Sequence, residues 1–327
     1  MNQIMIRGVG MQYIYGTADI MRQEDCVVVL GNFDGVHKGH QRLFQVAKDR
    51  AKANGLRTVV FSFYPHPTWV IGDNRKALIM SRRDKKQVIG EMGIDELIEY
   101  PFTRTFAAIS PETFFVDILM KRLKAKILVV GSNYYFGKGK TGNPKYLRQL
   151  GEKYNIEVCI VDAVKIGGSM ISSSSIRKLI LEGNIEKANE MLGHPYMIVG
   201  NVVQGKQLGR TIGFPTINIV ADPDRVYPPN GVYATRVKVY NKLYMGMTNI
   251  GVNPTVSGKC KMIETHLFDF ETDIYGEEVE VYFYQAIRLE QKFKDIHALK
   301  NQIKQDQVEV KEFFANPRNT FANSKGI

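Results

Sequence analysis

The sequence lacks any long run of apolar residues. Its continuous apolar runs, such as Val27–Leu30 and Ile127–Val130, have the length of a strand, whereas a helix that spans a membrane needs about 20 predominantly apolar residues. The N-terminal residues also lack the apolar stretch and small-residue cleavage site of a secretory signal. We therefore expect a cytoplasmic protein that does not enter a membrane.

Cysteine is also scarce. The three cysteines, Cys26, Cys159 and Cys260, are odd in number and lie far apart in the sequence. This spacing fits neither a disulfide framework nor a cluster of metal ligands. Each one stands among apolar residues, which predicts small, buried side chains.

Blocks of like charge are missing as well. The 44 Lys and Arg residues outnumber the 33 Asp and Glu residues, giving a net charge of +11, which is compatible with anionic partners such as nucleotides or nucleic acid. The basic residues are scattered, however, and no helix-turn-helix pattern is visible. We therefore expect no nucleic-acid partner. An apolar fraction of 44% and a charged fraction of 24% exclude disorder over most of the chain.

The length of 327 residues predicts two domains, and the first half has the pattern of an α/β domain. Helical patterns separate five short apolar runs that predict buried strands: Cys26–Leu30, Thr58–Phe63, Glu96–Tyr100, Ile127–Gly131 and Glu157–Val161. This alternation predicts a parallel, Rossmann-like sheet. Ligands bind beyond the carboxyl ends of the strands in such sheets.

The second half has the pattern of antiparallel β structure. Turn residues separate the predicted strands Tyr196–Val203, Val232–Tyr240, Leu243–Ile250, Lys261–Phe270 and Glu278–Gln285. These strands predict a small β-barrel, followed by a helix over Lys292–Phe314. We place the boundary near the helical stretch before Pro195, which gives domains 1–184 and 185–327.

The strongest chemical signal follows the first strand of the α/β half. Residues Gly31–His40 read GNFDGVHKGH. A glycine-rich turn between a strand and a helix presents backbone N–H groups and the helix dipole to an anion. His37 and His40 are three residues apart, so both can donate hydrogen bonds to the same phosphate. The spacing fits neither a dinucleotide fingerprint nor a Walker loop, and it favours phosphoryl or nucleotidyl transfer.

Two further segments join this block. Phe63–Pro67 reads FYPHP and Ile171–Arg177 reads ISSSSIR, the latter a serine-capped helix start with an arginine one turn later. Together with the histidine block they resemble the bacterial bifunctional riboflavin kinase/FAD synthetase family. The resemblance implies that His37 and His40 are catalytic. It implies nucleotide and phosphate contacts for Gly31, Phe33, Asp34, Gly35, Gly39, His66, Asn133, Ser173, Ser174 and Arg177.

The second half is similar to the same family. Gly205–Asn218 reads GKQLGRTIGFPTIN and resembles the riboflavin kinase signature. The resemblance implies phosphate contacts for Gly205, Gly209, Arg210, Thr211 and Gly213. Thr216 and Asn218 are two apart, so they face the same side of an extended segment. Their neutral oxygens suit Mg²⁺, which keeps waters and phosphates as its other ligands.

Two more segments resemble the parts of the family that act on or contact the flavin. Glu264 lies in MIETHLFDF, which is similar to the segment that carries the family's catalytic glutamate. A carboxylate near the riboflavin 5′-hydroxyl can orient this hydroxyl and accept its proton. The stretch that contains Arg288 and Phe293 resembles the family's segment leading to the helix that borders the flavin. The resemblance implies flavin contacts for these two residues.

The chain also departs from the family pattern. Asn133 and Tyr135 stand where an aspartate and an arginine are usual, and Asn143 replaces another aspartate. These changes predict slower adenylylation than phosphorylation. The resemblance implies that riboflavin and ATP give FMN, and that FMN and ATP then give FAD and pyrophosphate, with Mg²⁺ as cofactor. A riboflavin kinase with an impaired adenylyl domain and a flavin-responsive regulator stay open as alternatives. The sequence does not indicate an oligomeric state.

Overall fold

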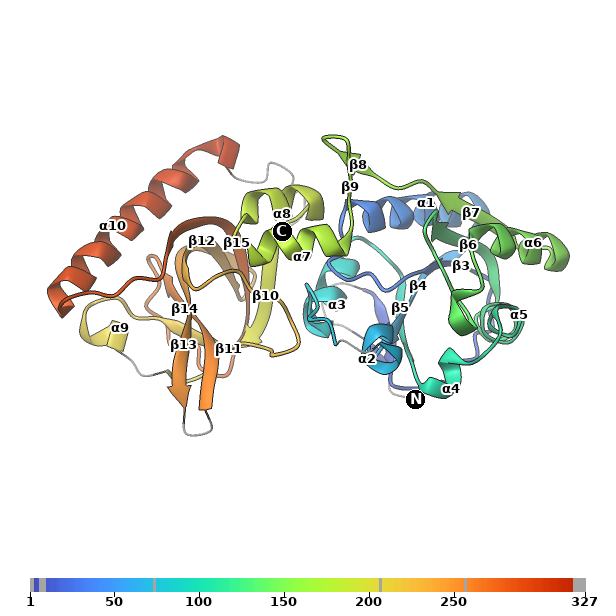
Figure 1. Cartoon of the computed structure of the whole chain (residues 1–327), viewed down its shortest axis with the longest axis horizontal. Coiled ribbons are helices and arrows are strands. Elements are labelled where there is room, and N and C mark those ends of the chain that lie inside the picture. Colours follow the sequence, from blue (N-terminus) through green and yellow to red (C-terminus); the bar gives the residue numbers. More distant parts are fainter. Residues whose placement is uncertain (1–2, 6–9, 73–74, 206–207, 256–257, 320–327) are drawn as a thin grey trace. The chain divides into compact units, whose positions relative to one another are not determined.

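The protein consists of two compact units (Figure 1). A computed structural model describes residues 3–5, 10–72, 75–205, 208–255 and 258–319. The first unit comprises Met1–Lys76 and Lys85–Ser172, and the second comprises Ala77–Asp84 and Ser173–Ile327. We describe each unit by itself.

The first unit is built on a seven-stranded sheet with the order β1-β2-β5-β4-β3-β6-β7. Its strands are β1 (Gln3–Met5), β2 (Gln12–Tyr15), β3 (Cys26–Leu30), β4 (Arg57–Tyr64), β5 (Glu96–Pro101), β6 (Ala125–Gly131) and β7 (Glu157–Val161). Every neighbouring pair is parallel except β1 and β2. The predicted parallel sheet and its five strands are confirmed, whereas β1 and β2 were not predicted.

Helices connect these strands. They are α1 (Lys38–Asn54), α2 (Pro67–Ile71), α3 (Arg82–Glu91), α4 (Arg104–Ala107), α5 (Pro111–Thr113), the π-helix η1 (Phe114–Arg122), the 3-10 helix η2 (Lys138–Lys140) and α6 (Pro144–Tyr154). A small hairpin of β8 (Lys165–Ile166) and β9 (Ser169–Met170) follows β7. All five residues of β3 are buried, because this strand has neighbours on both sides and a packed core around it.

The second unit is an antiparallel barrel with the strand order β10-β15-β12-β13-β14-β11. Its elements are α7 (Ser173–Leu181), α8 (Ile185–Leu192), β10 (Tyr196–Asn201), α9 (Leu208–Thr211), β11 (Ile217–Val220), β12 (Gly231–Val239), β13 (Lys242–Thr255), β14 (Gly258–Leu267), β15 (Glu278–Leu289), α10 (Ile296–Ala315) and the 3-10 helix η3 (Pro317–Asn319). The barrel nearly closes where the backbone N–H of Val203 donates to Asn218 O at 2.8 Å. The predicted barrel is confirmed.

Two sequence predictions for this unit differ from the structure. Strand β11 was not predicted, because its residues follow a glycine-rich segment that has the pattern of a loop. The last helix begins at Ile296 and not at Lys292, because Asp295 caps it by accepting from the N–H of Ala298 at 2.8 Å. Phe293 therefore precedes the helix.

A row of threonine hydroxyls crosses the inside of the barrel. Thr235, Thr248 and Thr265 lie on three adjacent strands and are fully buried. Their hydroxyl oxygens are 2.8 Å apart in each of the two neighbouring pairs. Because successive residues of a strand face opposite sides, the residues next to these threonines face away from the barrel interior.

The short segment Ala77–Asp84 packs with the second unit although it precedes most of the first unit in the chain. The N–H of Leu78 donates to Asp224 O at 2.8 Å, and the N–H of Val226 donates to Leu78 O at 2.8 Å. Asp84 forms an ion pair with Arg225, and their side chains are 0% and 2% exposed. The second unit is therefore assembled from two separate stretches of sequence.

The compact units and the predicted domains divide the chain at different residues. The structure groups α7 and the segment Ala77–Asp84 with the second unit, whereas the sequence placed the boundary after residue 184. That boundary stays a prediction. Among the described residues, no helix is long and apolar enough to cross a membrane.

Cys26 and Cys159 are free cysteines in the described part of the chain. Cys26 is fully buried in β3, and burial raises the pKa of its thiol to about 12. Cys159 is only half-buried, and its thiol donates to Glu157 Oε1 at 3.2 Å, so the prediction of a buried side chain was wrong for this residue. The side chain of Cys260 lies outside the described residues.

Candidate active sites

The turn after β3 in the first unit has an unusual backbone. Phe33 and Val36 have φ values of 54° and 39°, although neither is glycine. Both side chains are fully buried, and such packing can hold a backbone conformation that costs about 1–3 kcal/mol. A Cβ atom at Gly31 would come within 2.8 Å of the Phe33 ring, so the motif needs glycine at this position.

The two histidines of the motif lie against each other. His37 caps α1, and its Nδ1 accepts a hydrogen bond from the backbone N–H of His40 at 3.4 Å. The two rings stack with their centroids 3.6 Å apart. Because Nδ1 of His37 is an acceptor, its proton is on Nε2, which is then a donor.

His40 is held as a neutral imidazole. Desolvation of the ring, and then the neighbouring His37, keep the pKa of His40 well below its ordinary value. Among the described residues, Nδ1 of His40 is a buried ring nitrogen without a hydrogen-bond partner. An unsatisfied buried nitrogen is costly, and a bound ligand would offset that cost.

The other predicted residues of the first unit follow neighbouring strands. His66 follows β4 and caps α2, with its Nδ1 2.8 Å from Thr68 Oγ1. Asn133 follows β6 and is exposed. Strands β4, β3 and β6 are adjacent, so their carboxyl ends lie at one edge of the sheet. The structure therefore brings His66, the histidine block and Asn133 to the same edge.

Ser173, Ser174 and Arg177 belong to α7 in the second unit. The Arg177 guanidinium donates from Nε to Ala77 O at 2.8 Å. The roles that the resemblance implies for these three residues stay predictions.

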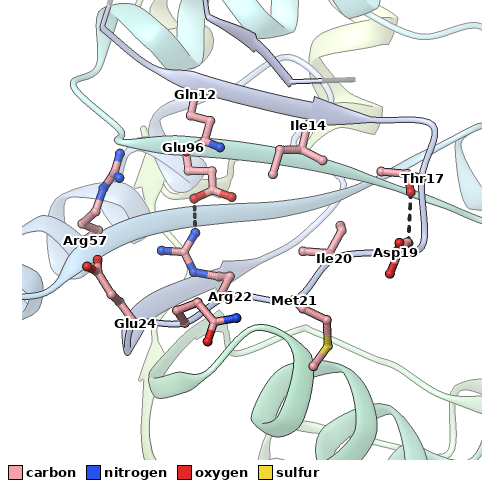
Figure 2. A pocket seen from close by; sticks show the side chains of 11 residues that line it. Gln12, Ile14, Thr17, Asp19, Ile20, Met21, Arg22, Glu24, Arg57 and Glu96 are labelled. Carbon is pink, nitrogen blue, oxygen red and sulfur yellow. Dashed lines mark hydrogen bonds and ion pairs between the residues drawn. The ribbon is translucent and has the colours of Figure 1, made fainter. Parts of the chain in front are cut away.

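The first unit also has a pocket at the opposite edge of the sheet (Figure 2). It lies at the amino ends of the strands, where Arg57 begins β4 and Glu96 begins β5. Figure 2 shows Arg22 pointing toward Glu96, with which it forms an ion pair. Because ligands of parallel sheets bind at the carboxyl ends, this pocket is separate from the predicted nucleotide site.

The second unit contains a pocket of about 320 Å³. One wall is a face of the sheet, and the other includes Leu299, Ile303 and Asp306, which are spaced to share one face of α10. The pocket brings together four residues that the sequence predicted from separate segments: Thr216, Glu264, Arg288 and Phe293.

Glu264 stands in a polar row across the sheet. It lies directly opposite Asn218 of β11 and Asn249 of β13. Asn249 lines the pocket but was not predicted, because only the pairing of the strands places it beside Glu264. His266, two residues after Glu264, also lines the pocket, and strand alternation in the sequence could have identified it.

Arg288 is fixed in place by a carboxylate. Its Nε lies 2.9 Å from Asp306 Oδ1, and its Nη2 lies 2.9 Å from Asp306 Oδ2. Gln302 Nε2 donates to the same carboxylate at 2.9 Å. The guanidinium also lies 5.5 Å from the centroid of the Phe293 ring. Asp306 was not predicted, because it is distant in sequence and meets Arg288 only in the folded barrel.

The glycines of the second unit allow close packing around the predicted metal ligands. A Cβ atom at Gly205 would lie 2.4 Å from Asn218 Nδ2, and one at Gly209 would lie 2.3 Å from Phe214 O. Gly213 has a φ of 89°. Arg210 and Thr211 lie in α9, whereas the signature residues Lys206 and Gln207 lie outside the described residues.

Thr216 and Asn218 differ in exposure. Thr216 lines the pocket, and Asn218 is 5% exposed, with its Nδ2 3.4 Å from Thr216 O. Among the described residues, no group of three or more His, Cys, Asp or Glu side chains can hold a metal ion. The neutral oxygens of Thr216 and Asn218 beside Glu264 nevertheless fit Mg²⁺, which takes most of its shell from phosphates and water.

Comparison with known proteins identifies both units. Residues 19–175 match the family model for FAD synthetase, and residues 192–314 match the one for riboflavin kinase. The bifunctional riboflavin kinase/FMN adenylyltransferase of Escherichia coli (strain K12) is 38% identical over 294 residues, covering 89% of this chain and 94% of that protein. The enzyme of the same name from Listeria monocytogenes is 38% identical over 302 residues, covering 91% and 96%.

A solved structure has the same fold over most of the chain. The crystal structure described as a macrolide-efflux protein from Streptococcus pneumoniae is 36% identical, with a TM-score of 0.81, and the match covers 91% of this chain and 98% of that one. The resemblance inferred from the motifs is confirmed. The chain belongs to the family of bifunctional riboflavin kinases/FMN adenylyltransferases.

Proposed function

We propose that this enzyme phosphorylates riboflavin in the pocket of the second unit and adenylylates FMN at the histidine turn of the first unit. The observation that carries the kinase assignment is the convergence of Thr216, Glu264, Arg288 and Phe293 on one pocket. These residues come from three different segments of the sequence, and their meeting at one pocket supports a shared site.

In the kinase step, Glu264 orients the 5′-hydroxyl of riboflavin and accepts its proton. The hydroxyl oxygen forms a bond to the γ-phosphorus of ATP while the bond from that phosphorus to ADP breaks. Arg288, held by Asp306 at 2.9 Å, borders the flavin together with Phe293. A guanidinium that a buried carboxylate already holds loses little conformational freedom when the flavin binds.

Mg²⁺ bound by Thr216 and Asn218 would neutralise charge on the ATP phosphates. The glycines at 205, 209 and 213 let the backbone approach those phosphates, because no side chain covers it there. Gly205 and Gly209 are also needed for packing, since a Cβ atom at either would collide with Asn218 or Phe214. The N–H groups and side chains of Arg210 and Thr211 complete the phosphate contacts.

In the adenylyl step, a phosphate oxygen of FMN attacks the α-phosphorus of ATP, and pyrophosphate leaves. No covalent enzyme intermediate is needed. The rings of His37 and His40 donate hydrogen bonds to oxygens that gain charge, supported by the turn residues Gly31–Gly35 and Gly39. His66 and Asn133 lie at the same edge of the sheet and contact the nucleotide.

A reciprocal pair of variants tests both assignments. Glu264→Gln should abolish most FMN formation from riboflavin and leave FAD formation from supplied FMN intact. His40→Ala should slow FAD formation by about 10²–10³-fold and leave FMN formation intact. The products are separated by chromatography after incubation with ATP and Mg²⁺. Full kinase turnover in Glu264→Gln, or equal loss of both activities in either variant, would overturn the assignment.

The remaining partners follow from this function. The enzyme acts on the small molecules ATP, riboflavin and FMN in the cytoplasm, without nucleic acid or membrane. Its net charge of +11 attracts the anionic substrates ATP and FMN by general electrostatic steering.

A further inference from the structure

His266 is a pocket residue to which neither the resemblance nor the reaction assigns a role. It lies on β14 two residues after Glu264, so both side chains face the same side of the strand. Both line the pocket. The ring is packed between Phe214, whose centroid is 5.5 Å away, and Phe268, whose centroid is 5.6 Å away.

The hydrogen bond of His266 determines its tautomer. Its Nδ1 lies 2.8 Å from the carbonyl oxygen of Pro215. A carbonyl oxygen has no proton to give, so Nδ1 must carry the proton and donate it. Burial keeps the pKa of His266 below its ordinary value, so the ring is neutral near pH 7, with Nε2 unprotonated.

The carbonyl that receives this hydrogen bond belongs to the residue before Thr216. Pro215 cannot donate a backbone hydrogen bond itself, so it is not held to β14 as a regular strand residue would be. The strand pairing of β11 with β14 begins only at Ile217, opposite Thr265. The imidazole therefore anchors the chain at the point where the predicted phosphate loop enters the sheet.

We propose that His266 is a positioning residue that fixes Thr216, through the Pro215 carbonyl, at a set distance from Glu264. The proposal rests on the proposed kinase site and deepens it. Glu264 and His266 share one strand, and His266 holds the loop residue next to Thr216. Strand β14 thus positions both the base, Glu264, and the predicted metal ligand, Thr216. A shift of about 1 Å between such groups can cost about 10²-fold in rate.

Three substitutions separate positioning from packing. His266→Leu removes the donor but keeps an apolar side chain between the two phenylalanines. His266→Asn keeps an N–H group near the position of Nδ1. His297→Leu is the control, because His297 is exposed on α10 and does not line the pocket.

We expect His266→Leu to lower kinase kcat by about 10–100-fold and to raise the Mg²⁺ concentration needed for half-maximal rate. His266→Asn should restore both values to within several-fold of wild type. His297→Leu should match wild type, and FAD formation from supplied FMN should stay unchanged in all three variants. Thermal unfolding is measured alongside, since a loss of packing alone would lower the melting temperature without changing the Mg²⁺ requirement.

The possible outcomes distinguish this proposal from the kinase assignment. If His266→Leu keeps wild-type kcat and Mg²⁺ dependence, or if His266→Asn is as impaired as His266→Leu, the positioning role is wrong. If Glu264→Gln is also fully active, the kinase site itself is misplaced. Loss of kinase activity in Glu264→Gln together with an unaffected His266→Leu would overturn the positioning role alone.

Discussion

At the scale of single residues, the loop after β6 is where the family resemblance implies a difference in charge. Asn133 and Tyr135 stand where the resemblance leads us to expect an aspartate and an arginine. Tyr135 is 57% exposed, so no packing requirement explains the tyrosine. An exposed tyrosine leaves room for the longer arginine. The resemblance to the family therefore implies that this loop lacks two charged groups.

We expect FMN to accumulate before FAD appears when wild type is given riboflavin and saturating ATP. The Asn133→Asp, Tyr135→Arg double variant should speed FAD formation severalfold and leave FMN formation unchanged. Time courses of both products measure this. Tyr240→Arg, at another exposed tyrosine, is the control for added positive charge. Conversion without FMN accumulation in wild type would show that the two substitutions are neutral.

Asn218 gives a second prediction for a single residue. Its side chain is packed beneath Gly205 and beside Thr216. Asn218→Ala removes a predicted ligand of the ground state, so it should raise KM for Mg-ATP more than it lowers kcat. Steady-state kinetics at varied Mg²⁺ measure both constants. A change in kcat alone would argue that Asn218 acts only in the transition state.

At the scale of elements, side chains at the starts of helices α3 and α6 cap the first turn by hydrogen bonds. Ser81 and Asp84 form a capping box at the start of α3, with Ser81 N–H donating to Asp84 Oδ2 at 2.7 Å and Asp84 N–H donating to Ser81 Oγ at 3.2 Å. Asn143 caps α6 in the same way, accepting from the N–H of Tyr146 at 2.9 Å. Asn143 thus has a structural role in the first unit.

We expect Asn143→Ala to lower the free energy of unfolding by about 1 kcal/mol, because one N–H of the first turn loses its acceptor. Asn143→Asp should unfold like wild type, because aspartate caps equally well. Lys145→Ala, at an exposed position of the same turn, is the control. Denaturant unfolding gives the three values, and an unchanged stability in Asn143→Ala would show that water replaces the cap.

At the scale of the whole molecule, the second unit depends on a segment from the first half of the sequence. Arg225 is fully buried and pairs with Asp84, and it also donates to Ile79 O at 3.0 Å and to Met197 O at 2.8 Å. A fragment that starts near residue 186 keeps Met197 but lacks Asp84 and Ile79. Its Arg225 would be a buried charge without its counter-ion.

We expect a fragment of residues 186–327 to phosphorylate riboflavin but to unfold at a lower temperature than the second unit does in the full chain. Arg225→Leu should stabilise this fragment and destabilise the full chain by about 3–5 kcal/mol, because Asp84 is then left unpaired. Arg236→Leu is the control, since Arg236 contacts only Tyr284 and Phe314 of the same fragment in its cation–π pairs. An effect of Arg225→Leu with the same sign in both contexts would contradict this account.

The sequence by itself determined the two architectures and most of their elements. Strand β3 and strand β7 have the predicted bounds, because a short apolar run between turn residues is a local signal. The histidine turn and the glutamate segment were found in the same way, since the residues of each motif are close in sequence. Local patterns also identified the kinase signature.

Only the tertiary structure decided which distant residues meet. Asn249 lies opposite Glu264 because of the register between β13 and β14, and Asp306 reaches Arg288 from a helix that follows the barrel. The Asp84 carboxylate that neutralises Arg225 lies 141 residues before it in the sequence. Register and long-range ion pairs result from the packing of whole elements, and no local pattern of residues specifies them.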